Sequence, residues 1–182
     1  MNPRKTACVV AACLTAASIG GAAQADQRTD LRAALKQIYE PSTIEVQAKA
    51  VEGRVARRGA LLRLEADGVS AKPFRVIQAN TKSPRFHVRD YALVEIASDR
   101  TVTVESGELR LSRGTEVVVL DIRVEGGAVQ LLTHTSQPVR HTDGRAAYGC
   151  TEFILRLDPS TMAAGDLGRV RESIERWLSL RS

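Results

Sequence analysis

Residues 117–133 of the chain, VVVLDIRVEGGAVQLLT, decide the fold that we expect. Two apolar-rich segments, 117–124 and 128–133, flank the turn Glu125-Gly126-Gly127. Glycine adopts the positive φ angles that tight hairpin turns require, so the stretch predicts a β-hairpin. It is the clearest hairpin of the sequence.

The alternation of apolar and polar residues extends in both directions from this hairpin. A second hairpin is predicted at Asp67-Gly68, between the segment 54–64 and a strand starting at Val69. The remaining predicted strands are 43–50, 74–79, 86–97, 101–104, 108–111 and 150–157. Short strands at this spacing, with a helix at either end, predict an α+β domain. Its sheet should be predominantly antiparallel β, closed as a bent sheet or a small barrel.

The N-terminal helix is predicted to be short and amphipathic. Leu31, Leu35 and Ile38 follow helical spacing, Asp30 is the expected N-cap, and Pro41 should end the helix.

The C-terminal helix is also predicted to be amphipathic, with Asp166 as its N-cap. We expect it to cover an open edge or face of the sheet, with Trp177 as a packing anchor. Its apolar face comprises Leu167, Val170, Ile174, Trp177 and Leu178.

The first 25 residues predict a secretory signal peptide. Arg4 and Lys5 precede an apolar or small run of 14 residues, 6–19, which is shorter than the roughly 20 residues that span a bilayer. The small residues of Ala23-Gln24-Ala25 suit a signal peptidase, so we expect cleavage between Ala25 and Asp26.

Export follows from this prediction. Residues 26–182 should form a single periplasmic or secreted domain without a transmembrane segment. Val10-Ala11-Ala12-Cys13 also resembles a lipobox, and the alternative is a protein anchored by a lipid on Cys13.

Composition disfavours some classes of function. The formal net charge of +5 falls to a mild +3 when Arg4 and Lys5 leave with the signal peptide, and this does not imply a nucleic-acid partner. Only 4% of residues are aromatic, which disfavours binding of nucleic acids or sugars by stacking. Cys8 and Cys13 leave with the signal peptide, so Cys150 is the only cysteine of the exported domain. No disulfide can form within it.

Cys150 and His141 are the weak candidates for catalysis. A cysteine nucleophile needs a nearby base, and His141 precedes Cys150 by nine residues across a Gly144 turn. However, Cys150 opens a predicted strand, where free cysteines are usually inert small apolar residues. We interpret it as a structural thiol.

No metal or cofactor site is predicted. The spacings of His87, His134 and His141 match no zinc pattern, and the sequence has no phosphate loop or dinucleotide fingerprint. The cluster Arg54, Arg57 and Arg58 is the candidate binding feature, because arginine binds phosphate and carboxylate in a bidentate manner. Its alternative interpretation is a solvated face.

One resemblance adds to this interpretation. Residues 53–69 follow the pattern G-x-V-x-x-x-G-x-x-L-x-L-x-x-D-G-V, and residues 111–117 follow L-x-x-G-x-x-V. Their order resembles exported bacterial β-domain proteins of no assigned function. The resemblance covers about half of the exported domain and implies no activity.

The leading functional hypothesis is a non-enzymatic binding or interaction module of the bacterial envelope. It would present a strand edge or the arginine cluster to an envelope protein, a lipid or a cell-wall component. The alternatives are a small thiol enzyme using Cys150 with His141, and a small barrel that binds an apolar ligand.

Overall fold

The computed structural model describes residues 19–46, 53–57, 59–74, 76–78, 86–88, 91–99, 101–104, 107–141 and 143–181. Within these ranges, the side chains of 19–25, 44–46, 53–57, 76–78 and 86–88 lie outside the description.

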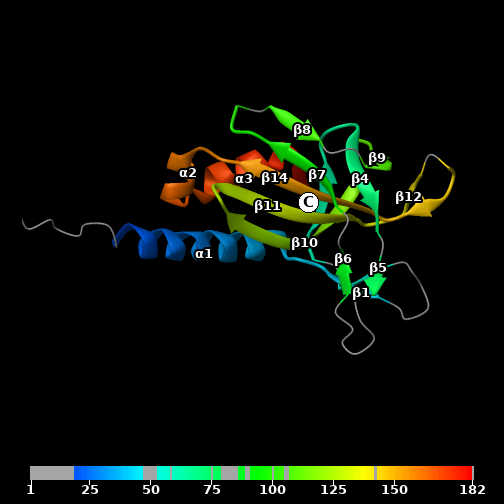
Figure 1. Ribbon diagram of the computed structural model, residues 1–182, viewed down its shortest axis with the longest axis horizontal. Coiled ribbons are helices and arrows are strands. Elements are labelled where there is room, and N and C mark those ends of the chain that lie inside the picture. The colour runs from blue at the N-terminus through cyan, green and yellow to red at the C-terminus, as the bar shows by residue number, and fades with distance from the viewer. Residues whose placement is uncertain are drawn as a thin grey trace, which may run out of the picture.

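A curled, strand-rich sheet forms the body of the protein (Figure 1). Its strands follow the order β15, β3, β10, β11, β14, β4 and β9, with β7 on the same side of β14 as β4, and β8 beyond β7. Their bounds are β3 Leu61–Leu64, β4 Val69–Pro73, β7 Ala92–Ile96, β8 Val102–Val104, β9 Leu109–Leu111, β10 Glu116–Glu125, β11 Ala128–Thr135, β14 Gly149–Arg156 and β15 Leu178–Leu180.

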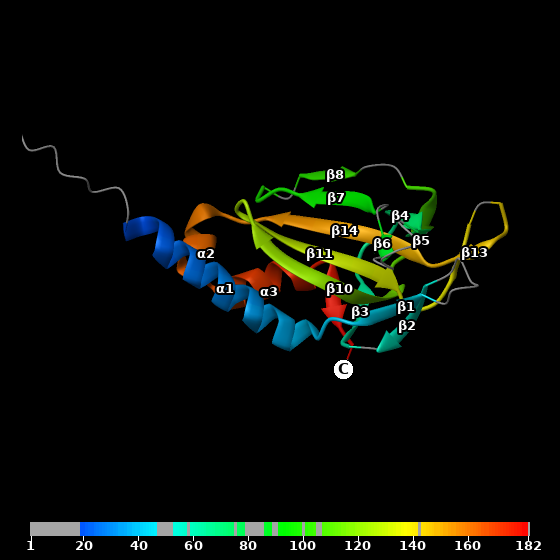
Figure 2. The same ribbon diagram turned by 60° about the horizontal axis from the view of Figure 1, so that its bottom comes forward.

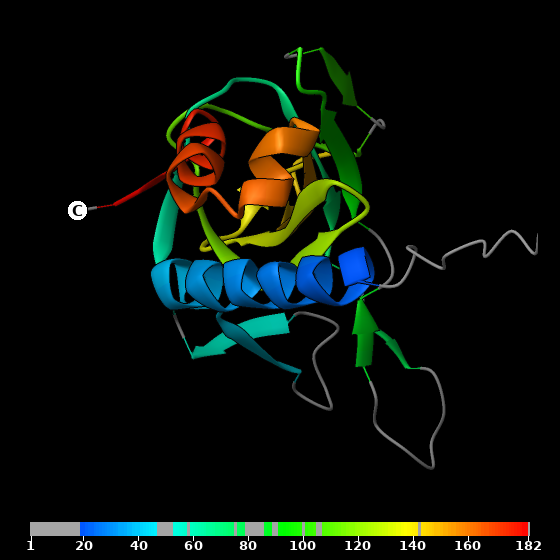
Figure 3. The ribbon, with the colours of Figure 1, turned by 90° about the vertical axis from the view of Figure 1, so that its left-hand side faces the viewer.

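Within the described ranges, three separate strand pairs accompany this sheet. They are β1 Thr43–Val46 with β2 Gly53–Arg57, β5 Val76–Gln78 with β6 Phe86–Val88, and β12 Val139–Arg140 with β13 Ala146–Ala147. The helices are α1 Ile19–Tyr39, α2 Pro159–Ala164 and α3 Leu167–Glu175. Figure 3 shows α2 and α3 together at one end of the curled sheet, with α1 crossing beneath them.

The predicted hairpin of residues 117–133 is confirmed as β10 and β11. Gly126 and Gly127 have φ angles of 58° and 78°, as the tight turn requires. The two strands pair from Glu125 and Ala128 back to Val117 and Thr135, with one irregularity between Val119 and Asp121. This long pair forms the centre of the sheet, and β10 packs against α1.

The sheet is antiparallel in most of its pairs but not in all of them. β7 and β14 pair in parallel from Ala92 and Thr151 to Ile96 and Leu155. Parallel neighbours require a long connection, and here β8 to β13 lie between the two strands in the sequence. The expectation of a predominantly antiparallel, bent sheet is therefore confirmed, within a mixed sheet.

The prediction of a hairpin at Asp67-Gly68 is wrong, although the predicted turn is present. Gly68 has the positive φ angle of 69° that the sequence suggested. The strands on either side do not pair with each other: β3 pairs with β10 and β15, whereas β4 pairs with β9 and β14. The turn is instead a corner at which the chain changes its partners.

Both helix predictions need correction at their ends. Asp30 does not cap the first helix, because α1 already begins at Ile19 and continues through the alanine-rich residues before Asp30. Leu31, Leu35 and Tyr39 are buried as an amphipathic helix requires. Residues 1–18 lie outside the described residues, and the cleavage after Ala25 stays a prediction.

The C-terminal helix is confirmed with Asp166 as its N-cap, whose side chain accepts a hydrogen bond from the Arg169 backbone N–H. However, α3 ends at Glu175, so Trp177 and Leu178 are not helical. Leu178 starts β15, which pairs with β3 and covers that edge of the sheet. Val170 and Ile174 of α3 are buried in the main core.

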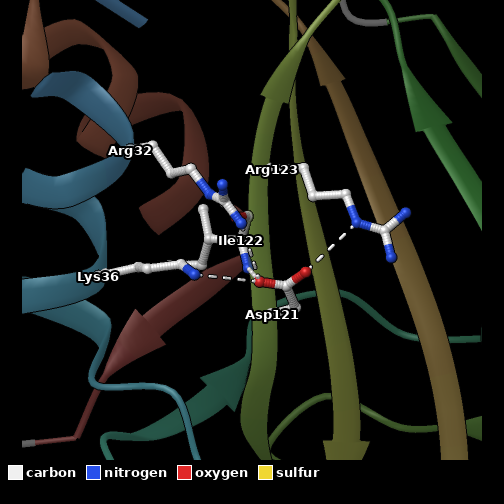
Figure 4. A network of polar contacts seen from close by, with 5 residues as sticks. All are labelled: Arg32, Lys36, Asp121, Ile122 and Arg123. Carbon is white, nitrogen blue, oxygen red and sulfur yellow. Dashed lines mark hydrogen bonds and ion pairs between the residues drawn. The ribbon is translucent and has the colours of Figure 1, made fainter. Parts of the chain in front are cut away.

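An ionic network attaches α1 to the sheet (Figure 4). The Asp121 carboxylate on β10 forms ion pairs with the side-chain nitrogens of Lys36 at 3.3 Å, Arg32 at 3.6 Å and Arg123 at 3.3 Å. Arg32 also donates to the backbone oxygen of Ile122 at 2.9 Å. Two basic residues on successive turns of α1 therefore fix the helix against β10.

No helix in the described part of the chain is long and apolar enough to cross a membrane.

Candidate functional site

Two rows of apolar side chains cross five neighbouring strands on the core face of the sheet. Directly opposite residues of paired strands share a face, so the strand registers define these rows. The first row is Val124, Val129, Leu155, Ile96 and Val102, and the second is Ile122, Leu131, Phe153, Val94 and Val104. Figure 2 shows the strands β10, β11, β14, β7 and β8 side by side in this order.

Each row is buried until its last residue, which is exposed. On β7, Ile96 is 7% and Val94 is 1% exposed, whereas their neighbours Val102 and Val104 on β8 are 39% and 44% exposed. These two valines are the exposed large hydrophobic residues of the described chain. The apolar face of the sheet is thus exposed to solvent at β8.

The backbone of β8 is also available along this edge. Ala97 N–H donates to the Thr101 carbonyl at 2.9 Å, so the polar groups of Thr101 face β7. Because these groups alternate along an antiparallel pair, the N–H and C=O groups of Val102 and Val104 point away from β7. Within the described residues, β8 pairs with β7 alone.

Natural edge strands are usually protected by a charge, a proline or a bulge. Residues 101–104, Thr-Val-Thr-Val, contain no charged residue and no proline, and their pairing with β7 is regular. Short length is the protective feature that β8 does have, since it spans three residues, but charge, proline and bulge are missing from residues 101–104.

A groove of about 460 Å³ adjoins this edge. Ile96 belongs both to the lining of the groove and to the row that ends at Val102. The other apolar lining residues are Ala97, Leu155, Leu157 and Trp177. The groove is bounded by α2, α3 and the ends of β7 and β14, and its volume lies within the range of small-molecule sites.

Three arginines of the groove are held in ion pairs. Arg156 contacts Glu95 at 2.5 Å, Arg176 contacts Glu172 at 2.5 Å, and Arg169 contacts Asp166 at 3.4 Å. These side chains form a polar rim around the apolar lining, an arrangement common to binding surfaces.

Cys150 lies in a different place, on the opposite face of β14 from Phe153 and Leu155. Its cross-strand neighbour is His134 of β11, and both residues are fully buried. The ring of His134 lies 5.2 Å from Phe74 and 4.9 Å from Tyr148, and Nδ1 is 2.8 Å from the Thr135 carbonyl oxygen. Burial raises the pKa of Cys150 to about 12, so the thiol is protonated at neutral pH.

His141, the predicted partner of Cys150, is placed beside two carboxylates. Its Nε2 atom lies 3.6 Å from Glu108, and its Nδ1 atom lies 3.1 Å from Asp143. The histidine next to Cys150 in the strand register is His134. Sequence spacing favoured His141, whereas the β11–β14 register brings Cys150 and His134 together.

Among the predicted arginines, Arg54 and Arg57 lie on β2, which pairs with β1, but their side chains lie outside the described atoms. Arg58 lies outside the described residues. A role of this cluster in binding stays a prediction. The described residues include no group of three or more His, Cys, Asp or Glu side chains that could hold a metal ion.

Comparison of the chain with protein-family models, with curated proteins and with solved structures finds no match. The resemblance to exported β-domain proteins stays a prediction.

Proposed function

We propose that the protein is a non-enzymatic binding module of the bacterial envelope, and that β8 pairs with an extended segment of a partner protein. The observation that carries this proposal is the exposure of Val102 and Val104 at the ends of two otherwise buried apolar rows. A strand added beside β8 would continue both rows and bury both valines. The signal peptide predicted in residues 1–25 supports the location.

The chemistry of the edge favours a polypeptide over a lipid or a sugar. The outward N–H and C=O groups of two alternate residues match the backbone of another strand, as in recognition by strand addition. The valine side chains would then select apolar residues at alternate positions of the partner. Since residues 101–104 are uncharged, the affinity should change little with salt.

The buried state of Cys150 argues against the thiol-enzyme alternative. A thiol with a pKa of about 12 supplies almost no thiolate at neutral pH, and the fully buried sulfur is not accessible to a substrate. Apolar side chains of the described strands pack together inside the curled sheet, which argues against a barrel cavity for an apolar ligand.

The experiment uses a substitution that removes only an outward N–H group. Val104→Pro takes away the Val104 N–H, which faces the free edge, and leaves the β7–β8 hydrogen bonds in place. Val104→Thr is the matched control, because it keeps the N–H group and the branched shape. Thermal melting should show that both variants remain folded.

Peptides are first selected from a random displayed library on the immobilised wild-type protein and then measured by fluorescence anisotropy. We expect the selected peptides to have alternating apolar residues. Val104→Pro should weaken their binding by about tenfold or more, the equivalent of one hydrogen bond, whereas Val104→Thr should retain most of it. Peptides that bind the proline variant as tightly as the wild type would contradict the proposal.

A further inference from the structure

We infer that the groove beside β8 binds an alkylammonium cation, a positively charged amine carried on an apolar chain. The inference is independent of strand pairing by β8, because it depends on the lining of the groove alone. Its two components are an apolar surface for the hydrocarbon chain and one carboxylate that has no partner among the described residues.

The apolar component is formed by Ile96, Leu155, Leu157 and Trp177. Leu155 and Ile96 are directly opposite each other on β14 and β7, so their side chains form a continuous surface. Trp177 is partly exposed and adds an aromatic ring, to which cations are attracted in addition to its apolar contact.

The charge component is Asp158. The three arginines of the groove already have carboxylate partners, and so does Glu172 through Arg176. Asp158 occupies the N-cap position of α2, but its side chain makes no capping hydrogen bond. Among the described residues, the Asp158 carboxylate has neither a hydrogen-bond donor nor an ion-pair partner, although its backbone oxygen accepts Met162 N–H.

These ion pairs, together with the carboxylate of Asp158, indicate that the ligand is positively charged. An anion would meet arginines whose charges are already balanced by Glu95, Asp166 and Glu172, and it would be repelled by the Asp158 carboxylate. A cation meets Asp158 directly and disrupts no existing pair. The apolar part of the lining then favours an amine with a hydrocarbon chain over a small hydrated cation.

Two sources could supply this group: a free amine, or a lysine side chain of a segment paired with β8. Ile96 is common to the groove and to the row that ends at Val102, so a side chain from the edge could extend into the groove. The Val104→Pro variant separates the sources, since it should leave a free amine bound and release a lysine peptide.

Trp177 is the only tryptophan of the chain and provides the measurement. The wild-type protein is titrated with n-hexylammonium, hexanoate and 1-hexanol, which share one hydrocarbon chain and differ in the head group. We expect a saturable change in tryptophan fluorescence with hexylammonium and much weaker binding of hexanoate. Asp158→Asn should reduce the affinity for hexylammonium by about fivefold, as expected for one exposed ion pair, and leave hexanol unchanged.

Glu125→Gln is the matched control, because Glu125 is an exposed acid on the central hairpin, outside the groove. It should leave all three titrations unchanged. Equal binding of hexanoate and hexylammonium, no response of Trp177 to hexylammonium, or an unchanged affinity in Asp158→Asn would each overturn the inference. None of these outcomes depends on whether β8 pairs with a partner strand.

Discussion

His134 of β11 and Cys150 of β14 lie directly opposite each other in the strand register, and both side chains are fully buried. Burial shifts the two pKa values in opposite directions. It raises the pKa of the Cys150 thiol to about 12 and lowers the pKa of His134 to about 4, while the Thr135 carbonyl counteracts the shift of His134. Both groups are consequently neutral at pH 7, unlike the charged thiolate–imidazolium pair of a cysteine enzyme.

The first prediction concerns the reactivity of Cys150. Since the sulfur is buried and protonated, the native protein should react with an aromatic disulfide reagent far more slowly than the unfolded chain at the same pH. The reaction is followed by absorbance with and without denaturant, and the unfolded protein serves as the control. Complete labelling of the native thiol within the time that the unfolded chain requires would contradict the prediction.

The second prediction is that stability falls as acid is added, because of His134. Its folded pKa of about 4 lies below the ordinary histidine pKa of 6.5, so between these pH values the unfolded chain binds a proton that the folded chain does not. The contribution is fully present above pH 6.5 and is lost as the pH falls towards 4, by up to roughly 3 kcal/mol. Urea unfolding at several pH values measures this slope.

His134→Asn is the matched control for this slope. The asparagine amide can still donate to the Thr135 carbonyl but does not titrate in this range. The variant should be less stable at pH 7 and should show a shallower loss of stability between pH 6.5 and 4. An unchanged slope would assign the acid sensitivity to other groups.

The central hairpin could be predicted because its information is local. The apolar segments and the two glycines at the turn lie within 20 residues, and the structure confirms both the strands and the positive φ angles. Asp67-Gly68 shows the limit of such local signals. The turn was correct, but the partners of the two strands are set by β9, β10, β14 and β15, which lie far away in the sequence.

The candidate site could not be predicted for a similar reason. Val102 and Val104 alternate with threonines as in any half-buried strand, and the sequence does not indicate whether another element covers them. Their exposure follows from the position of β8 at the end of the rows. Likewise, Leu178 follows Ile174 at helical spacing, yet it lies on β15, because α3 ends before it.

The third prediction uses a close approach of two backbone segments. A Cβ atom on Gly59 would lie 1.4 Å from the carbonyl oxygen of Glu40, and the same oxygen accepts Ala60 N–H at 3.2 Å. Gly59→Ala must therefore displace the backbone after α1, and we expect a loss of about 2 kcal/mol or more in the free energy of unfolding.

Gly127→Ala provides the comparison for Gly59→Ala. A Cβ atom on Gly127 meets nothing within 4 Å, but the residue has a φ angle of 78°. Its cost is therefore conformational only and should be about 1 kcal/mol. Urea unfolding of both variants ranks the two effects, and a larger loss for Gly127→Ala than for Gly59→Ala would contradict the described packing of Gly59 against Glu40.

The fourth prediction concerns the attachment of α1 by Asp121. Partial burial opposes ionisation of this carboxyl group, but the Ile122 backbone N–H, Lys36 and Arg123 together hold its pKa below the usual value. Asp121→Asn keeps an acceptor for Ile122 N–H and removes the charge that pairs with Arg32 and Lys36. Because these groups are partly exposed, we expect a loss of only about 1 kcal/mol.

The loss should be concentrated in α1. Hydrogen exchange of the amides of residues 31–39 should become several times faster in Asp121→Asn, whereas the β10–β11 hairpin should change less. High salt should reduce the difference between the variant and the wild type, because it screens the partly exposed ion pairs. Glu172→Gln, which removes the Arg176 pair on α3, is the control. If exchange in α1 were equally fast in both variants, Asp121 would not be the residue that holds this helix against the sheet.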